Sequence, residues 1–282
     1  MADQTQVVVL ASQKGGSGKT TLAGHIAVRA ELAGAGPVAI IDTDPQGSLA
    51  KWWNAREAEA PAFIQASLPT LGSDIAQLRD SGFRLIIIDT PPSVTSSIVE
   101  VVTHADLVIV PTRPSPHDLR AVGATVDIVE HQRKPLVFVV NSATMRARIT
   151  SETAVALSQH GTVAPATIHH RVDFAASMID GRTVGEVDPE SRSAKEIEEL
   201  WTYLDGRLKR LRDGPIAARM ANEPVYEPQL RMDDPVEIVE EPAPAPASTW
   251  DGVDRRQRDL GPPPNLPDRR QRHAVFGRRG AV

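Results

Sequence analysis

The stretch that decides the fold is QVVVLASQKGGSGKTTL, residues 6–22. An apolar run at 6–12 leads into a glycine-rich turn, and the turn leads into a helical pattern that begins near Lys19. Glycines let backbone N–H groups curl around an anion, and the start of a helix adds the positive end of its dipole. This order of elements predicts a phosphate-binding loop, with a plain surface turn as the alternative.

The loop carries two lysines, Lys14 at its start and Lys19 at its end. We expect Lys19 to reach the β- and γ-phosphates of a nucleotide and the Thr20 hydroxyl to ligate Mg²⁺. A second lysine in the same spot would be repelled by the first, so we expect Lys14 to point away from its own loop. Across a symmetric dimer it can reach the partner's nucleotide. The alternative is a solvated loop lysine.

The rest of the first 212 residues alternates between strand and helix patterns. Further nearly continuous apolar runs, typical of strands buried on both faces, lie at 37–43, 83–89, 106–112 and 135–141. Amphipathic helical stretches include 19–33, 117–131 and 194–211. We therefore predict an α/β fold with a doubly wound, mostly parallel sheet and helices on both faces.

Polar residues stand where three of these strands end. Asp42 and Asp44 follow one strand, Asp89 ends another, and Asn141 ends a third. In a doubly wound sheet these positions lie beside the phosphate loop. One of the first two carboxylates can hold Mg²⁺ through water while the other orients an attacking water; each can also be a strand-end turn former. The amide of Asn141 fits adenine, with a structural turn as the rival interpretation.

Other predictions concern smaller features of the first 212 residues. Ser193 and Glu196 predict a capping box at the start of the last helix. Trp52 and Trp53 are adjacent on a helical stretch, so we expect one ring in the core and one partly exposed.

The composition of the chain excludes several kinds of site and segment. The chain has 282 residues, 41% apolar and 24% charged, with a net charge of −5 and no cysteine. The lack of cysteine excludes disulfides, thiolate metal sites and cysteine nucleophiles. The sequence contains neither a signal peptide pattern nor an apolar run of the roughly 20 residues that a membrane span needs. We expect a cytoplasmic protein.

Residues 213–282 differ from the domain before them. The segment 223–241 holds seven carboxylates and one arginine, whereas 251–282 holds eight arginines and four aspartates. The pentapeptide DRRQR occurs twice, at 254–258 and 268–272. This Pro-rich tail lacks the apolar residues for a core, so we expect it to be disordered. It can strengthen DNA binding, act as a short docking motif or serve as a spacer.

Four segments together resemble the ParA/MinD family of P-loop ATPases. The KGG-x-GKT form of the loop is similar to that family's deviant Walker A box. IIDTDPQGS, LIIIDTPPS and VVNSATMRAR resemble its second box, its Walker B strand and its adenine-contacting strand, at 40–48, 85–93 and 139–148. The resemblance spans about residues 6–211, and DPQGS is closer to the ParA branch. The form of the loop implies that Lys14 acts on the nucleotide of the partner subunit.

The resemblance implies a role for most site residues. Asp44 becomes the catalytic carboxylate, and Asp42 and Asp89 join Thr20 at Mg²⁺. ATP is expected on the phosphate loop, with Asn141 and Pro189 at the base. The loop residues concerned are Gly15, Gly16, Ser17, Gly18, Lys19, Thr20 and Thr21.

The resemblance also implies partners. ParA-like proteins form ATP-dependent homodimers that bind DNA without sequence preference on the nucleoid, and a ParB-like adaptor stimulates hydrolysis. Basic candidates for the DNA face are Arg146, Arg148, Arg171, Arg192 and Lys195. The tail lacks the amphipathic helix with which MinD-like members bind membrane, so we expect no membrane partner. We also expect no DNA-binding domain before the first strand. A metabolic ATP-dependent enzyme on the same fold and a MinD-like positioning ATPase that works on a membrane surface are the alternatives, and the cargo stays open.

Overall fold

The computed structural model describes residues 5–92 and 96–214. These residues fall within one unit of the chain, Met1–Gln229. They contain a seven-stranded sheet in the order β3-β2-β4-β1-β5-β6-β7, and every neighbouring pair of strands is parallel. The predicted doubly wound parallel sheet is therefore confirmed. Apart from residues 213 and 214, the predicted tail with its DRRQR pair lies outside the described residues.

The five predicted strands are all present, each slightly shorter than its apolar run. They are β1 (Gln6–Leu10), β2 (Val38–Asp42), β4 (Leu85–Asp89), β5 (Leu107–Thr112) and β6 (Leu136–Val140). Two further strands, β3 (Ala62–Gln65) and β7 (Thr162–Val163), lie at the sheet edges. Their four and two residues are too short to produce a readable apolar run.

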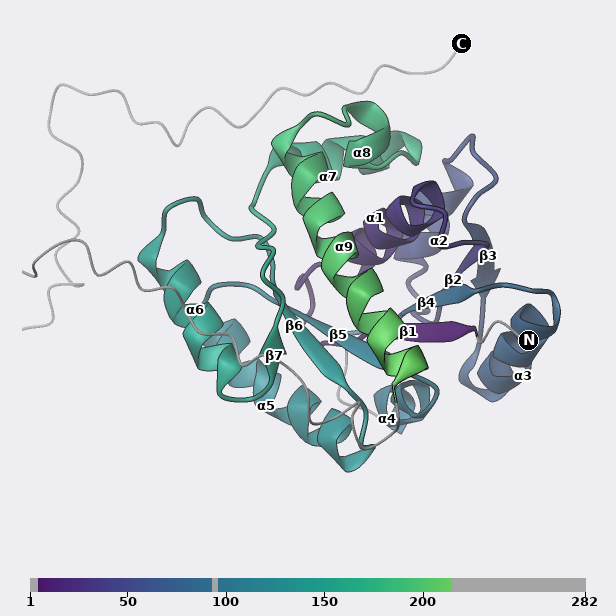
Figure 1. The fold of residues 1–282 in the computed structure, drawn as a ribbon, viewed down its shortest axis with the longest axis horizontal. Coiled ribbons are helices and arrows are strands. Elements are labelled where there is room, and N and C mark those ends of the chain that lie inside the picture. The colour runs from purple at the N-terminus through teal and green to yellow at the C-terminus, as the bar shows by residue number, and fades with distance from the viewer. Residues whose placement is uncertain (1–4, 93–95, 215–282) are drawn as a thin grey trace, which may run out of the picture. The chain divides into compact units, whose positions relative to one another are not determined.

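Helices cover both faces of the sheet (Figure 1). In chain order they are α1 (Lys19–Leu32), α2 (Ser48–Asn54), α3 (Leu68–Asp80), α4 (Ser96–Thr103), α5 (Pro116–His131), α6 (Arg148–Ser158), α7 (Val172–Ser177), the short 3-10 helix η1 (Met178–Asp180), α8 (Val184–Val187) and α9 (Arg192–Asp213). The predicted helices at 19–33, 117–131 and 194–211 correspond to α1, α5 and α9.

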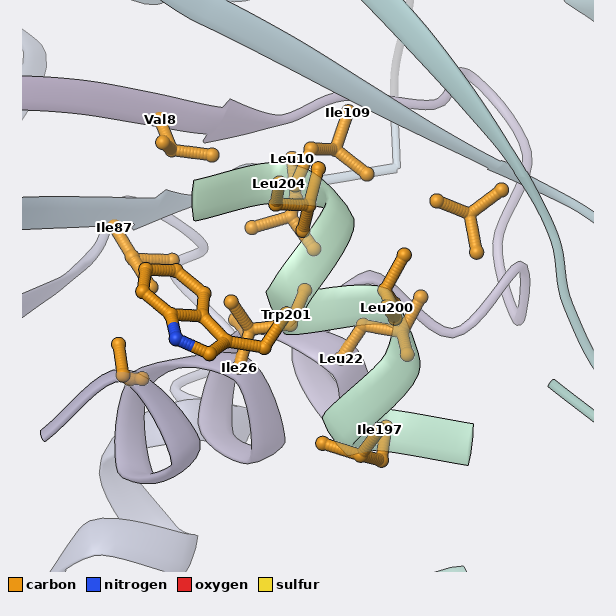
Figure 2. Close-up of a cluster of buried hydrophobic side chains, with 14 of the residues drawn as sticks. Val8, Leu10, Leu22, Ile26, Ile87, Ile109, Ile197, Leu200, Trp201 and Leu204 are labelled. Carbon is orange, nitrogen blue, oxygen red and sulfur yellow. The ribbon is translucent and has the colours of Figure 1, made fainter. Parts of the chain in front are cut away.

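Alternate strand residues belong to two separate hydrophobic clusters, one on each face of the sheet. Val8 and Leu10 of β1 pack into a cluster with α1 and α9, whereas Val7 and Val9 pack into a cluster with α3, α4 and α5. Figure 2 shows Leu22 and Ile26 of α1 against Leu200, Trp201 and Leu204 of α9, below the strands in this view. The two cores hold the strand ends, and with them the phosphate loop, in fixed positions.

The two tryptophans lie as predicted. Trp52 is buried in the cluster that contains α1, and Trp53 is partly buried and packs against it. Each indole N–H is satisfied by a backbone carbonyl: Trp52 donates to Arg182 and Trp53 to Pro61.

The predicted capping box of the last helix is wrong. Helix α9 begins two residues earlier, and its N-cap is Ser191, whose hydroxyl accepts from the backbone N–H of Ala194 at 3.1 Å. Ser193 instead donates to Asp173, and Glu196 pairs with Arg171 and His169. Both side chains that the local pattern assigned to the cap therefore make tertiary contacts instead.

His25 connects the helix of the phosphate loop to α8. Its side chain is fully buried; Nδ1 donates to the Thr21 carbonyl at 2.8 Å and Nε2 accepts from the backbone N–H of Val184 at 3.2 Å. Burial lowers the pKa of His25 from 6.5 to about 4, so the ring is neutral in the folded protein.

We expect this histidine to make stability depend on pH. The unfolded chain protonates His25 near its ordinary pKa and the folded chain near 4, so the stability it supplies is complete above pH 6.5 and is lost as pH falls towards 4. The unfolding free energy of the wild type minus that of His25→Gln should therefore fall by ~2 kcal/mol between pH 7 and pH 5.

Urea unfolding of both proteins at each pH measures this difference and cancels other titrating groups, Asp89 among them. His160→Gln, in which the lost histidine is exposed, is the matched control. A difference that stays constant from pH 7 to pH 5 would show that His25 is free to take up a proton in the folded state.

Candidate functional site

The phosphate loop joins β1 to α1 and is shaped by two left-handed glycines. Gly16 has φ 73° and Gly18, the N-cap of α1, has φ 96°. A Cβ on Gly18 would lie 2.1 Å from the amide nitrogen of Asn141, so no side chain fits there. The first backbone N–H groups of a helix have no partner within the helix, so the start of α1 next to this loop is suited to an anion.

Asn141 fixes the loop from the end of β6. Its Nδ2 donates to the Ser17 carbonyl at 2.7 Å, and the residue is buried. The structure therefore gives Asn141 a direct contact with the phosphate loop, which the sequence did not indicate, and its expected contact with adenine stays a prediction. Pro189, the other residue expected at the base, lies exposed between α8 and α9.

Lys19 is a buried cation at the start of α1. It is 6% exposed, and Nζ donates to the Ser12 carbonyl at 3.2 Å. Burial lowers the pKa of Lys19, while nearby Asp89 and Asp44 act in the opposite direction. A phosphate anion in the loop would stabilise the charged lysine, because it would replace the water that burial removes.

Thr20 and Asp89 lie together beside Lys19. The Thr20 hydroxyl donates to Asp89 Oδ2 at 2.5 Å, and Asp42 is the neighbour of Asp89 across the β2–β4 pair. Burial raises the pKa of Asp89 to about 7, and the charge of Asp42 adds to this effect. The other oxygen of Asp89, Oδ1, is buried and has no hydrogen-bond partner among the described residues.

These groups fit a magnesium ion. The Thr20 hydroxyl and the Asp89 carboxylate, whose Oδ1 has no hydrogen-bond partner among the described residues, supply hard oxygen donors. Mg²⁺ prefers such donors alongside water and phosphate oxygens. The described residues contain no group of three or more His, Asp or Glu side chains that could hold a metal ion. Substrate phosphates and water would therefore complete the shell, as is usual for nucleotide-bound magnesium.

Asp42 and Asp44 have different surroundings. Asp42 is fully buried, and its two oxygens accept from the backbone N–H groups of Asp44 at 2.9 Å and Ala50 at 3.1 Å. It fixes the turn between β2 and α2, and burial raises its pKa. Asp44 is half-buried, accepts from the Gln46 N–H at 2.9 Å and faces the cavity in front of the loop.

That cavity has a volume of about 710 Å³. Its walls come from the loop, α2, the end of β4 and η1. The lining residues are Gly15, Gly16, Gly18, Lys19, Thr20, Thr21, Asp44, Gln46, Ser48, Lys51, Trp52, Thr90, Pro92, Met178 and Ile179. It places Lys19, Thr20 and Asp44 around one space that is large enough for the phosphates of a nucleotide.

Lys14 is held away from this cavity. Its Nζ pairs with Asp118 Oδ2 on α5 at 2.5 Å, and the lysine side chain is 30% exposed. Arg113 pairs with the other oxygen of Asp118 at 3.2 Å, and the Ser115 hydroxyl donates to Asp118 Oδ2. Arg113 and Asp118 could not be recognised from the sequence as partners of the loop, because the pattern Ser-Pro-x-Asp indicates only the start of a helix.

The basic candidates fall into two groups. Arg146 and Arg148 precede or begin α6, Arg192 and Lys195 begin α9, and all four are exposed. Arg171 differs because it is half-buried, and its partner Glu196, at 2.7 Å, raises the pKa of the arginine. Arg148 and Lys195 also pair with carboxylates, Glu152 and Glu190, but at the exposed surface. The segments that carry Arg146 and Arg171 run side by side, since Ala143 and His169 form a parallel bridge.

The described residues contain no helix that is long and apolar enough to span a bilayer.

Comparison with known proteins agrees with this geometry. The profile of the CobQ/CobB/MinD/ParA nucleotide binding domain matches residues 8–184. "Maintenance of carboxysome distribution protein A" of Halothiobacillus neapolitanus is 29% identical over 203 residues, which are 68% of this chain and 93% of the relative. "Protein ParA" of Rhizobium radiobacter is 26% identical over 219 residues, which are 73% and 97% of the two chains.

A solved structure of a Cyanothece McdA variant in complex with ATP superposes with a TM-score of 0.59 at 19% identity. It covers 71% of this chain and 96% of that chain, and at this identity it shows the common P-loop fold alone. The match over residues 8–184, with the loop, Lys19, Thr20 and Asp89 in the places described above, establishes that the chain belongs to the CobQ/CobB/MinD/ParA family of nucleotide-binding proteins.

Proposed function

We propose that the chain is a ParA-like positioning ATPase. In this proposal two subunits close around ATP, the dimer binds DNA without sequence preference, and hydrolysis to ADP and phosphate releases it. An adaptor protein on the cargo, similar to ParB, stimulates the hydrolysis. The protein acts in the cytoplasm, on the nucleoid.

The observation that carries this proposal is that the two lysines of one loop lie in different places. Lys19 lines the cavity, whereas Lys14 is turned out onto α5 and does not line it. A lysine that already lies outside its own nucleotide site is suited to stabilise charge on the phosphates of a second subunit, as cations supplied in trans do elsewhere. A metabolic enzyme acting as a single subunit has no such use for Lys14.

The chemistry assigned to the remaining residues is phosphoryl transfer to water. Lys19 and the loop amides hold the phosphates, and Thr20 and Asp89 hold Mg²⁺, with Asp42 behind them. Bound Mg²⁺ would neutralise charge on the phosphate oxygens. Asp44 is the half-buried carboxylate that faces the cavity, so it is the residue to orient the attacking water.

DNA binding is assigned to the exposed cations at the start of α6 and α9. Arg146, Arg148, Arg192 and Lys195 are on the surface, whereas Arg171 is engaged by Glu196 and is the least available of the five. One relative is named for the maintenance of carboxysome distribution, and another is named ParA. A protein compartment, a plasmid, a chromosome and a receptor cluster all remain possible cargoes.

The mass of the protein in solution tests the dimer directly. Light scattering should give a dimer with Mg-ATP and a monomer with Mg-ADP or without nucleotide. Lys14→Gln should stay a monomer with Mg-ATP while still binding a fluorescent ATP analogue. Lys209→Gln, which removes another carboxylate-paired lysine far along α9, should dimerise normally. A Lys14→Gln protein that dimerises like the wild type would exclude the role in trans.

Asp44→Asn should stop hydrolysis without preventing dimerisation. The amide keeps an oxygen that accepts from the Gln46 N–H, so the turn stays in place while the negative charge that orients water is lost. Phosphate release should fall by about 100-fold, and the ATP-bound dimer should persist. Asp80→Asn, an exposed aspartate at the end of α3, is the control. Turnover at the wild-type rate would remove Asp44 from the mechanism.

Replacing both Arg146 and Arg148 by glutamine should weaken DNA binding in the ATP state. Two lost phosphate contacts should lower the slope of log K against log salt by about 2. The matched control replaces Arg79 and Arg84 by glutamine; both are exposed, Arg79 in α3 and Arg84 directly before β4, away from α6 in the chain. Equal effects of the two double variants on fluorescence anisotropy with a DNA duplex would contradict the assigned face.

A further inference from the structure

We infer that Asp118 is a positioning residue for Lys14: it holds the lysine within its own subunit, and Arg113 is the cation that stays with Asp118 when Lys14 leaves for the partner subunit. The inference rests on the proposed in-trans role of Lys14 and names the groups that control it. We call Lys14, Arg113, Ser115 and Asp118 the Asp118 cluster.

The geometry of the cluster is that of one buried carboxylate shared by two cations. The Asp118 side chain is only 3% exposed, and each of its oxygens takes one cation: Oδ2 takes Lys14 Nζ and Oδ1 takes Arg113 Nε. The lysine and the arginine are 30% and 37% exposed, so both can move into solvent. Together the contacts lower the pKa of Asp118 although its burial acts in the opposite direction.

The two cations are attached differently. Arg113 is five residues before Asp118 on the same β5–α5 connection, whereas Lys14 comes from the phosphate loop, 104 residues away in the chain. The Arg113 guanidinium also lies against that loop, since a Cβ on Gly16 would be 3.8 Å from its nearest nitrogen. Arg113 therefore stays beside Asp118, and the exchangeable partner is Lys14.

The charges around Asp118 determine the free energy that Lys14 needs to leave it. A buried carboxylate left without a cation is strongly destabilising, so Lys14 could not leave if it were the sole partner of Asp118. With Arg113 in place the carboxylate keeps one counter-ion, and Lys14 can move to the phosphates of a second subunit. Charge removal at Asp118 and at Arg113 should therefore change dimerisation in opposite directions.

A helix cap alone does not account for this arrangement. Asp118 is the third residue of α5, its N–H donates to the Ser115 hydroxyl at 3.1 Å, and a Ser–Asp pair of this kind stabilises any helix start. Capping needs no cation, yet here two cations from different segments meet on its carboxylate. An asparagine at this position keeps an oxygen to accept from Ser115, so it separates the charge from the cap.

The test compares the ATP-dependent dimerisation constant of the full-length wild type with that of two variants, by sedimentation in Mg-ATP. Asp118→Asn should strengthen dimerisation by about tenfold, because a charge-assisted hydrogen bond to Lys14 is lost from the monomer. Arg113→Gln should weaken it by a similar factor, and Arg113→Lys should restore it. Asp205→Asn, which removes the carboxylate partner of Lys209, is the matched control and should change nothing.

Opposite shifts in the two variants, with the double variant Lys14→Gln/Asp118→Asn remaining a monomer in Mg-ATP, would support the inference. A merely structural role would weaken dimerisation in both variants. If the wild type dimerises and Asp118→Asn has no effect or weakens it, the positioning role is wrong and the proposed function stands. Arg113→Gln decides the matter by itself should Asp118→Asn not fold. A wild type that stays monomeric in Mg-ATP overturns both proposals.

Discussion

The phosphate and magnesium residues of the site depend on one constraint, the parallel alignment of β1, β2 and β4. Parallel strands end at the same edge of the sheet, and Asp42 and Asp89 are register neighbours there, with the phosphate loop leaving β1 beside them. Two carboxylates are thereby held close together next to a buried lysine. Burial raises the pKa of Asp89 to about 7, and burial of the lysine lowers the pKa of Lys19. Bound magnesium and phosphate would favour the charged forms of both groups.

Much of this arrangement could be predicted from the sequence. The five long strands were readable because they are buried on both faces and therefore nearly continuously apolar. That Lys19, Thr20 and Asp89 lie together could be expected because each stands at a strand or helix end beside the loop, and their roles stay predictions. The short edge strand β7 and the cap of α9 could not, because two residues give no period and because tertiary partners claimed Glu196.

The residues around Lys14 show where such reasoning stops. The sequence indicated that Lys14 should point away from its own loop, and in the structure its Nζ lies on Asp118. Nothing local to Lys14 indicates an acceptor 104 residues away, or that Arg113 would share it. Asn141 illustrates the same limit: its amide suits a base, yet its contact with the Ser17 carbonyl arises only when β6 is placed beside the loop.

The central claim is that ATP converts this chain into a DNA-binding dimer, and one measurement tests it most directly. Binding to a random-sequence DNA duplex is followed with Mg-ATP, with Mg-ADP and without nucleotide, across a series of salt concentrations. The account predicts binding only with Mg-ATP, and an affinity that falls steeply with salt because exposed arginines displace counterions. Binding that is absent in all three states, or equal in all three, would contradict it.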